Sequence, residues 1–68
     1  MREVSTREGE IRLGQFLKLT DLVELGSDVK LLLSMGRVKV NDEIETRRGR
    51  QLVRGDVVTV GEDILRVM

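Results

Sequence analysis

The stretch that decides the fold covers residues 36–54 and reads GRVKVNDEIETRRGRQLVR. In its first part, residues 37–40 alternate basic and apolar side chains, which is the pattern of a β-strand with one buried face. The Asn-Asp pair at 41–42 tolerates positive φ better than most residues and predicts a two-residue turn. Residues 43–45 then return as the partner strand, so this part predicts a tight β-hairpin.

The second part of the stretch is rich in arginine. Residues 47–54, RRGRQLVR, contain four arginines and no acidic residue. The whole chain carries 12 basic and 12 acidic residues, so positive charge is concentrated here on an otherwise neutral protein. The planar donor fork of arginine matches the geometry of a phosphate group. This local basic block therefore indicates a polyanionic ligand, of which nucleic acid is the commonest.

A first helix is predicted upstream of this stretch. Leu13, Phe16 and Leu17 recur at helical spacing and predict a helix from about Leu13 to Thr20, with a looser turn through Leu25. Phe16 is the only aromatic residue of the chain, and its place on this apolar stripe predicts that it lies in the core.

A second helix is predicted between that turn and the hairpin. Ser27 is expected to cap it, with Asp28 in the positive first turn. Apolar residues follow at helical spacing through 29–33. Leu31 and Met35 widen the apolar face, so we expect this helix to be buried on more than one side.

The remaining elements follow from turn and strand signals. Gly36 is expected to stop the second helix in a left-handed conformation. Residues 55–56, Gly-Asp, mark a turn, 57–60 a strong strand, 61–63 another turn, and 64–67 the last strand. The predicted fold is therefore α+β, with two main helices followed by a small antiparallel β-sheet.

Size and composition limit the function classes. A chain of 68 residues has room for one small core, so residues 1–68 are expected to form a single domain. No apolar run approaches the roughly 20 residues that span a bilayer. The N-terminal MREVSTREGE is too polar for a signal peptide, so a cytoplasmic location without membrane contact is expected.

Catalysis is not expected from this composition. The chain has no cysteine and no histidine, which removes thiolate chemistry, the usual general base and the usual metal ligand. Asp42, Glu43 and Glu45 could suggest a metal cluster, but they lie on alternating faces of the predicted hairpin. They are expected to pair with surface lysines and arginines instead. We therefore predict no catalytic residue, no cofactor and no metal site.

Four short motifs occur in a fixed order along the chain. They are Arg-Leu at 12–13, the second helix at 27–36, GRVKVN at 36–41 and GDVVTV at 55–60. This order resembles the RNA-binding domain of small-subunit ribosomal protein S-four, with its Arg-Leu-Asp, Gly-x-Val-x-Val-Asn and Gly-Asp-x-(Val/Ile)-x-Val motifs. The resemblance covers residues 11–60, and ETRRGR at 45–50 looks most like the stand-alone bacterial members.

The chain departs from the family pattern at three places. Gly14 stands where the family commonly has aspartate, and Asp42 stands where the turn glycine is usual. Residues 26–28, Gly-Ser-Asp, replace a serine that is commonly followed by arginine. Lys30 on the same helix is the expected substitute for that RNA contact.

The resemblance and the charge pattern together predict the RNA-binding residues. Bland alternatives stay open: the arginine loop could be only solvated, Lys18 and Lys30 could point to solvent, and Arg12 could pair with Glu8 or Glu10. The predicted RNA-binding set is Arg12, Lys18, Lys30, Arg37, Lys39, Arg47, Arg48 and Arg50.

The predicted function is non-catalytic RNA binding. Without a spare aromatic residue for base stacking, the chain should dock on structured RNA through phosphate contacts. Ribosomal RNA or tRNA is the expected ligand, the ribosome or a ribosomal precursor the expected partner, and a monomer the expected state. The alternative is a protein-interaction adaptor whose arginine loop meets an acidic partner.

Overall fold

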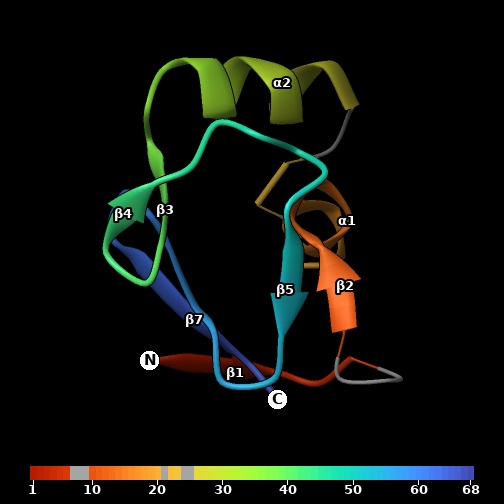
Figure 1. Ribbon diagram of the computed structural model, residues 1–68. Coiled ribbons are helices and arrows are strands. Elements are labelled where there is room, and N and C mark those ends of the chain that lie inside the picture. The colour runs from red at the N-terminus through yellow and green to blue at the C-terminus, as the bar shows by residue number, and fades with distance from the viewer. Residues whose placement is uncertain (7–9, 21, 24–25) are drawn as a thin grey trace.

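Seven short strands and two helices make up the part of the fold that the structure describes. A computed structural model describes residues 1–6, 10–20, 22–23 and 26–68, without the side chains of residues 26 and 27. Figure 1 shows the arrangement of these elements. In chain order they are β1 (Arg2–Val4), β2 (Glu10–Arg12), α1 (Leu13–Leu19), α2 (Gly26–Ser34), β3 (Val38–Val40), β4 (Glu43–Ile44), β5 (Gln51–Val53), β6 (Val57–Val60) and β7 (Asp63–Val67).

The strands form two sheets. The larger has the order β1-β7-β6-β3-β4, and the smaller pairs β2 with β5. Strand β1 runs parallel to β7, whereas every other pair is antiparallel. The α+β class is thus confirmed. The predicted order of two helices followed by an antiparallel sheet is wrong, because strands precede as well as follow the helices and the larger sheet is mixed.

The hairpin formed by β3 and β4 follows the prediction. Asn41 and Asp42 have φ values of 53° and 70°, and both lie in the left-handed region that this turn type requires. Val38 and Val40 are buried, whereas Lys39 between them is exposed. The inward face of β3 therefore belongs to the core, and Lys39 lies on the opposite face of the sheet.

The helices lie close to their predicted positions in the sequence, but the burial of the second helix differs from the prediction. Helix α2 starts at Gly26, one residue before the expected cap, and Gly36 stops it with a φ of 69°. The predicted turn through Leu25 falls partly outside the described residues. Leu31 and Met35 are 59% and 54% exposed, so the expectation that α2 is buried on more than one side is wrong. Neither described helix is long and apolar enough to cross a membrane.

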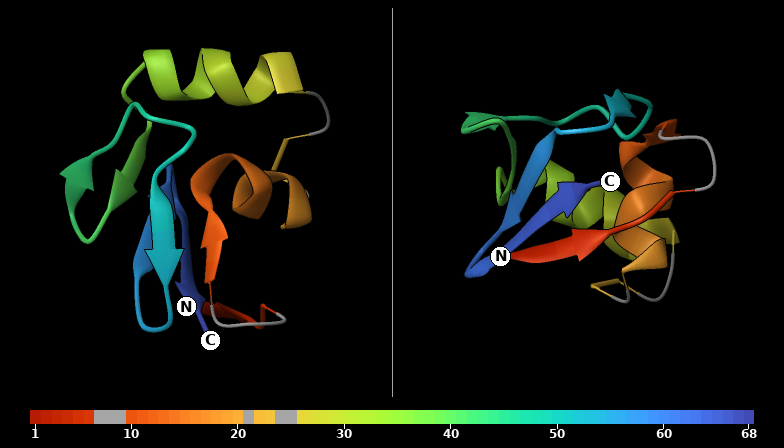
Figure 2. Two further views of the ribbon diagram at one scale, coloured as in Figure 1. Left: turned by 45° about the vertical axis from the view of Figure 1, so that its right-hand side comes forward. Right: turned by 90° about the horizontal axis from the view of Figure 1, so that it is seen from below.

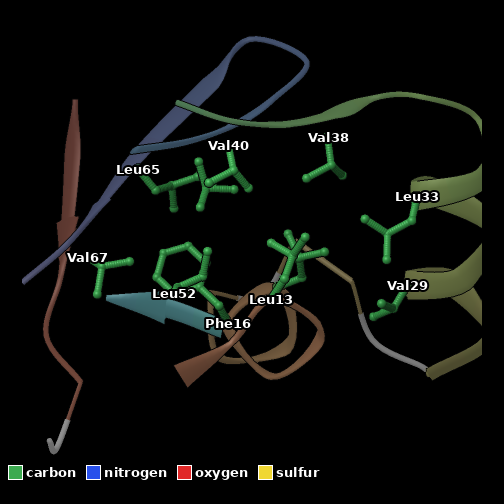
Figure 3. Packing of buried hydrophobic residues seen from close by; sticks show 11 residues of the cluster. Leu13, Phe16, Val29, Leu33, Val38, Val40, Leu52, Leu65 and Val67 are labelled. Carbon is green, nitrogen blue, oxygen red and sulfur yellow. The ribbon is translucent and has the colours of Figure 1, made fainter. Parts of the chain in front are cut away.

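The core lies between the larger sheet, the helices and β5, as Figure 3 shows. Phe16 is completely buried there, as the sequence predicted. Only one face of α2 reaches this layer. The buried apolar residues are Leu13, Phe16, Leu17, Val29, Leu33, Val38, Val40, Leu52, Val58, Leu65 and Val67.

Candidate nucleic-acid interface

The connection between β4 and β5 docks on the start of α1. Figure 2 shows this connection passing beneath α2 before β5 runs beside β2. The backbone N–H of Leu13 donates to the carbonyl of Arg50, and that of Gly14 donates to the carbonyl of Arg48, both at 2.9 Å. The first N–H groups of a helix have no partner inside the helix, so the arginine loop supplies two of the missing acceptors.

Gly14 lets the loop approach this closely. A Cβ atom at Gly14 would lie 3.4 Å from the Arg48 carbonyl oxygen and 3.5 Å from the Arg48 Cβ. A longer side chain there would push the loop away from the helix. Arg12 adds a further link, since its Nη1 donates to the carbonyl of Gly49 at 2.8 Å. Arg12 forms no ion pair with Glu10 within the described part of the chain, and the alternative partner Glu8 lies outside the described residues.

Glu45 holds the loop from the inside. Its side chain is only 8% exposed, and its carboxylate accepts from Nε and Nη2 of Arg47 at 3.2 and 3.1 Å and from Nη1 of Arg50 at 3.1 Å. The backbone N–H groups of Thr46 and Arg47 also donate to it, at 3.0 and 3.2 Å. The expectation that Glu45 pairs with arginine is confirmed, although the carboxylate is buried and not on the surface.

These hydrogen bonds set the ionisation of Glu45. Donation from the Arg47 side chain is the largest cause, and with the backbone of Arg47 and the side chain of Arg50 it lowers the pKa of Glu45 to about 2, against the opposing effect of burial. The same contact raises the pKa of Arg47. The carboxylate is therefore charged at neutral pH and neutralises part of the loop's positive charge.

The three arginines of the loop consequently differ in how freely their side chains can contact a ligand. The Arg50 side chain is 30% exposed and bound to Glu45, so it helps to hold the loop. The Arg47 side chain is bound at one edge but is 74% exposed. Both ion pairs in the described part of the chain belong to Glu45, and neither includes Arg48.

Arg48 instead borders a pocket of about 210 Å³ between α1, α2 and the loop. The cations of Arg12 and Lys18 join it there, although the three residues lie far apart in sequence. None of the described lining residues is acidic. We call this site the basic pocket, and its lining is Arg12, Gly14, Gln15, Lys18, Val29, Arg48 and Gly49.

The other predicted site residues lie outside the basic pocket. Lys30 is exposed on α2, one residue after the pocket residue Val29, and Arg37 is exposed just beyond that helix. Lys39 lies in register with Ile44 and Thr59 on the face of the sheet that points away from the core. The structure thus gathers Arg12, Lys18 and Arg48, keeps Arg47 and Arg50 beside them, and separates Lys39 from them.

Two lining residues, Gln15 and Val29, were not predicted from the sequence. Arg12, Gln15 and Lys18 follow one another at intervals of three, and all three are exposed. Arg12 directly precedes α1, and Gln15 and Lys18 lie on it. This polar i, i+3 spacing is a signal that could have identified Gln15. Val29 carried no such signal, because a valine on an apolar helical stripe indicates only core.

Comparison with known proteins agrees with this architecture. The family model described as "S4 domain" matches residues 4–68. The chain is also 54% identical over 50 residues to the "Probable ribosome maturation protein RlbA" of Bacillus subtilis (strain 168), an alignment that covers 74% of this chain and 70% of that protein. The resemblance indicated by the four sequence motifs is confirmed, and the chain belongs to the S4 domain family.

Proposed function

We propose that this protein binds structured ribosomal RNA during ribosome maturation and that it docks through the basic pocket. The single observation that carries the proposal is the convergence of Arg12, Lys18 and Arg48 on one hollow with no acidic residue in its described lining. The relative's name, which refers to ribosome maturation, favours ribosomal RNA over tRNA. We also propose that the protein is non-catalytic, cytoplasmic and monomeric.

The chemistry of the pocket suits the phosphodiester backbone. Arg12 and Arg48 offer planar forks that bind phosphate oxygens in pairs, and Lys18 adds a compact point charge. The backbone of the loop is already fixed by α1 and Glu45, so binding would order few further groups. Such preorganisation lowers the entropic cost of association.

The proposed surface extends beyond the pocket itself. Exposed basic residues lie beside it. Arg47 on the loop, Lys30 on α2 and Arg37 just beyond the end of α2 are proposed as outer phosphate contacts. Lys39 lies on another face of the molecule and is left out of the proposed interface.

Salt-dependent binding of a ribosomal RNA hairpin tests this proposal. The logarithm of affinity should fall linearly with the logarithm of salt concentration, by about 0.9 for each neutralised phosphate. Arg48→Gln should weaken binding and flatten the slope by about 1. Arg66→Gln is the matched control, because Arg66 is exposed on β7, outside the pocket lining. Equal effects of the two substitutions would contradict the proposed location.

Ribonuclease treatment and competition with excess RNA separate RNA binding from the adaptor alternative. An adaptor would hold its protein partner after ribonuclease treatment and in the presence of excess competitor RNA. The proposed RNA-binding protein should lose ribosome association under both conditions. Association that survives both treatments would favour the adaptor.

A further inference from the structure

The basic pocket is larger than a phosphate contact needs. A cavity of about 150 Å³ is enough to hold a benzene ring. The basic pocket has about 210 Å³, so a six-membered ring has room in it. Phosphate groups alone would use the charged side chains and leave the space between them empty.

The lining of the basic pocket also suits a nucleobase. Val29 closes the inner end of the pocket but is only 1% exposed, and Gly14 adds no side chain that would occupy the space. The Gln15 side chain accepts a weak hydrogen bond from the backbone N–H of Arg12 at 3.4 Å through its Oε1. The amide nitrogen of Gln15 makes no hydrogen bond within the described residues, so it can donate to the edge of a base.

Stacking on this protein must come from arginine. Phe16, the only aromatic residue, is completely buried in the core. Unpaired bases also stack on guanidinium planes, and Arg12 and Arg48 both line the basic pocket. A base could therefore be held by a guanidinium plane and an amide donor.

We propose that the basic pocket receives one unpaired pyrimidine base, extruded from a bulge in the structured RNA, while Arg12, Lys18 and the edge of the Arg48 guanidinium hold the flanking phosphates. This inference rests on the proposed function and specifies the RNA feature that the pocket selects. A bulged base is already unpaired, so extruding it costs less than flipping a paired base. A pyrimidine is the smaller base, so its single ring enters the volume of about 210 Å³ with less rearrangement of the lining than a purine needs.

Three RNA hairpins test the inference directly. They share stem and loop and differ at one position: a bulged uridine, an abasic bulge that keeps the phosphate, and a bulged adenosine. The uridine hairpin should bind about tenfold more tightly than the abasic one. The salt slopes of these two hairpins should be equal, because their charges are equal. The adenosine hairpin should bind more weakly than the uridine hairpin.

Gly14→Ala tests the pocket from the protein side. The added methyl would lie 3.7 Å from Cγ1 of Val29 and at least 3.4 Å from Arg48, so the fold accepts it while the pocket becomes smaller. Alanine is also the better helix former, so the melting temperature should stay level or rise. The ratio of the affinities for the uridine and abasic hairpins should fall close to one.

Gln15→Ala provides a second variant that does not alter the contact between α1 and the loop. It should reduce the uridine preference without changing the salt slope. Ser34→Ala is the control, because Ser34 is exposed on α2 outside the pocket lining, and the preference should stay at the parent value.

The outcomes separate this inference from the proposed function. Equal affinity of the parent protein for the uridine and abasic hairpins overturns the base-binding inference, even if Arg48→Gln still flattens the salt slope. Equal or tighter binding of the adenosine hairpin overturns the assignment of a pyrimidine. If no hairpin binds in a salt-dependent way, the proposed function fails as well.

Discussion

Among single residues, Glu45 has the widest influence on the candidate interface. Its buried carboxylate accepts hydrogen bonds from two arginine side chains and two backbone N–H groups. A buried charge without such partners is strongly unfavourable, so the surrounding loop must keep Arg47 and Arg50 in place. Glu45 therefore fixes the loop whose other side presents Arg48 to solvent.

This role predicts a pH dependence of stability. The pKa of Glu45 is lowered from 4.5 to about 2 in the folded protein, chiefly by Arg47. A carboxylate whose pKa is lowered in the folded protein adds to the free energy of unfolding. This contribution is complete above the pKa of the unfolded chain and is lost as the pH falls from about 4.5 toward 2. Because the Arg47 side chain is largely exposed, the contribution should be about 1–3 kcal/mol, less than a fully buried pair would give.

Urea unfolding of the parent protein and Glu45→Gln between pH 2 and 7 measures this contribution. The variant should be less stable at pH 7, and the difference between the two unfolding free energies should shrink as the pH falls to 2. The other carboxylates titrate in both proteins and cancel in the difference. Parallel curves for the two proteins would show that Glu45 does not stabilise the fold through its charge.

Among the elements, the β3–β4 turn is tied to the turn before β6. Nδ2 of Asn41 donates to Oδ1 of Asp56 at 3.1 Å, and the N–H of Val57 donates to Oδ1 of Asn41 at 3.0 Å. Asp56 also accepts from the N–H of Val53 at 2.9 Å. Asn41 ends one of the motifs that indicated the family, and Asp56 lies in another. Both residues act here in holding the fold and lie outside the basic pocket.

The same turn offers a stabilising substitution. Asp42 has a φ of 70°, which costs less for glycine than for any residue with a side chain. Asp42→Gly should therefore raise the unfolding free energy by about 0.5–1 kcal/mol. Asp42→Ala is the matched control and should lower it, because alanine lacks both the freedom of glycine and the polar side chain of aspartate. A glycine variant that melts below the parent would contradict the strain argument.

The accuracy of the sequence predictions depended on how local each element is. The hairpin turn and the Gly36 stop were predictable, because positive φ and alternating burial are properties of a few adjacent residues. Strand β1 was not predicted, since its three residues contain only one apolar side chain and pair in parallel with β7 at the far end of the chain.

The candidate site shows the same limit. Arg12, Lys18 and Arg48 were predicted from charge and from the family resemblance, but not as one site. Their convergence depends on hydrogen bonds between α1 and the loop more than 30 residues later. The burial of Glu45 follows from the same packing, so a sequence pattern could suggest its arginine partners but not its depth.

On the scale of the whole molecule, a small core supports two different surfaces. The helices and the arginine loop form the basic pocket, and the outward face of the sheet carries Ile44, Lys39, Thr59 and Ile64 in one row across four strands. The chain has no net charge, so the proposed attraction of RNA must come from local charge. The interface therefore depends on the fold that gathers these cations.

Two leucines of α2 test how much the stability of this fold depends on the buried face of that helix. Leu33 is 2% exposed, whereas Leu31 on the same helix is 59% exposed. Leu33→Ala should lower the unfolding free energy by about 2–5 kcal/mol, a large share of the stability of a small domain. Leu31→Ala makes the same chemical change and should stay within about 0.5 kcal/mol of the parent. Thermal melts of both variants give the comparison, and similar losses would contradict the placement of α2.

The location of the RNA is the central claim, and NMR titration of the isotope-labelled protein with a ribosomal RNA hairpin tests it most directly. Backbone amide shifts should change first and most at Gly14, Gln15, Lys18, Arg48 and Gly49, which line the basic pocket. The amides of Lys39, Thr59 and Ile64 on the outward sheet face should change little. The largest changes on that sheet face, with the pocket amides unmoved, would contradict the account.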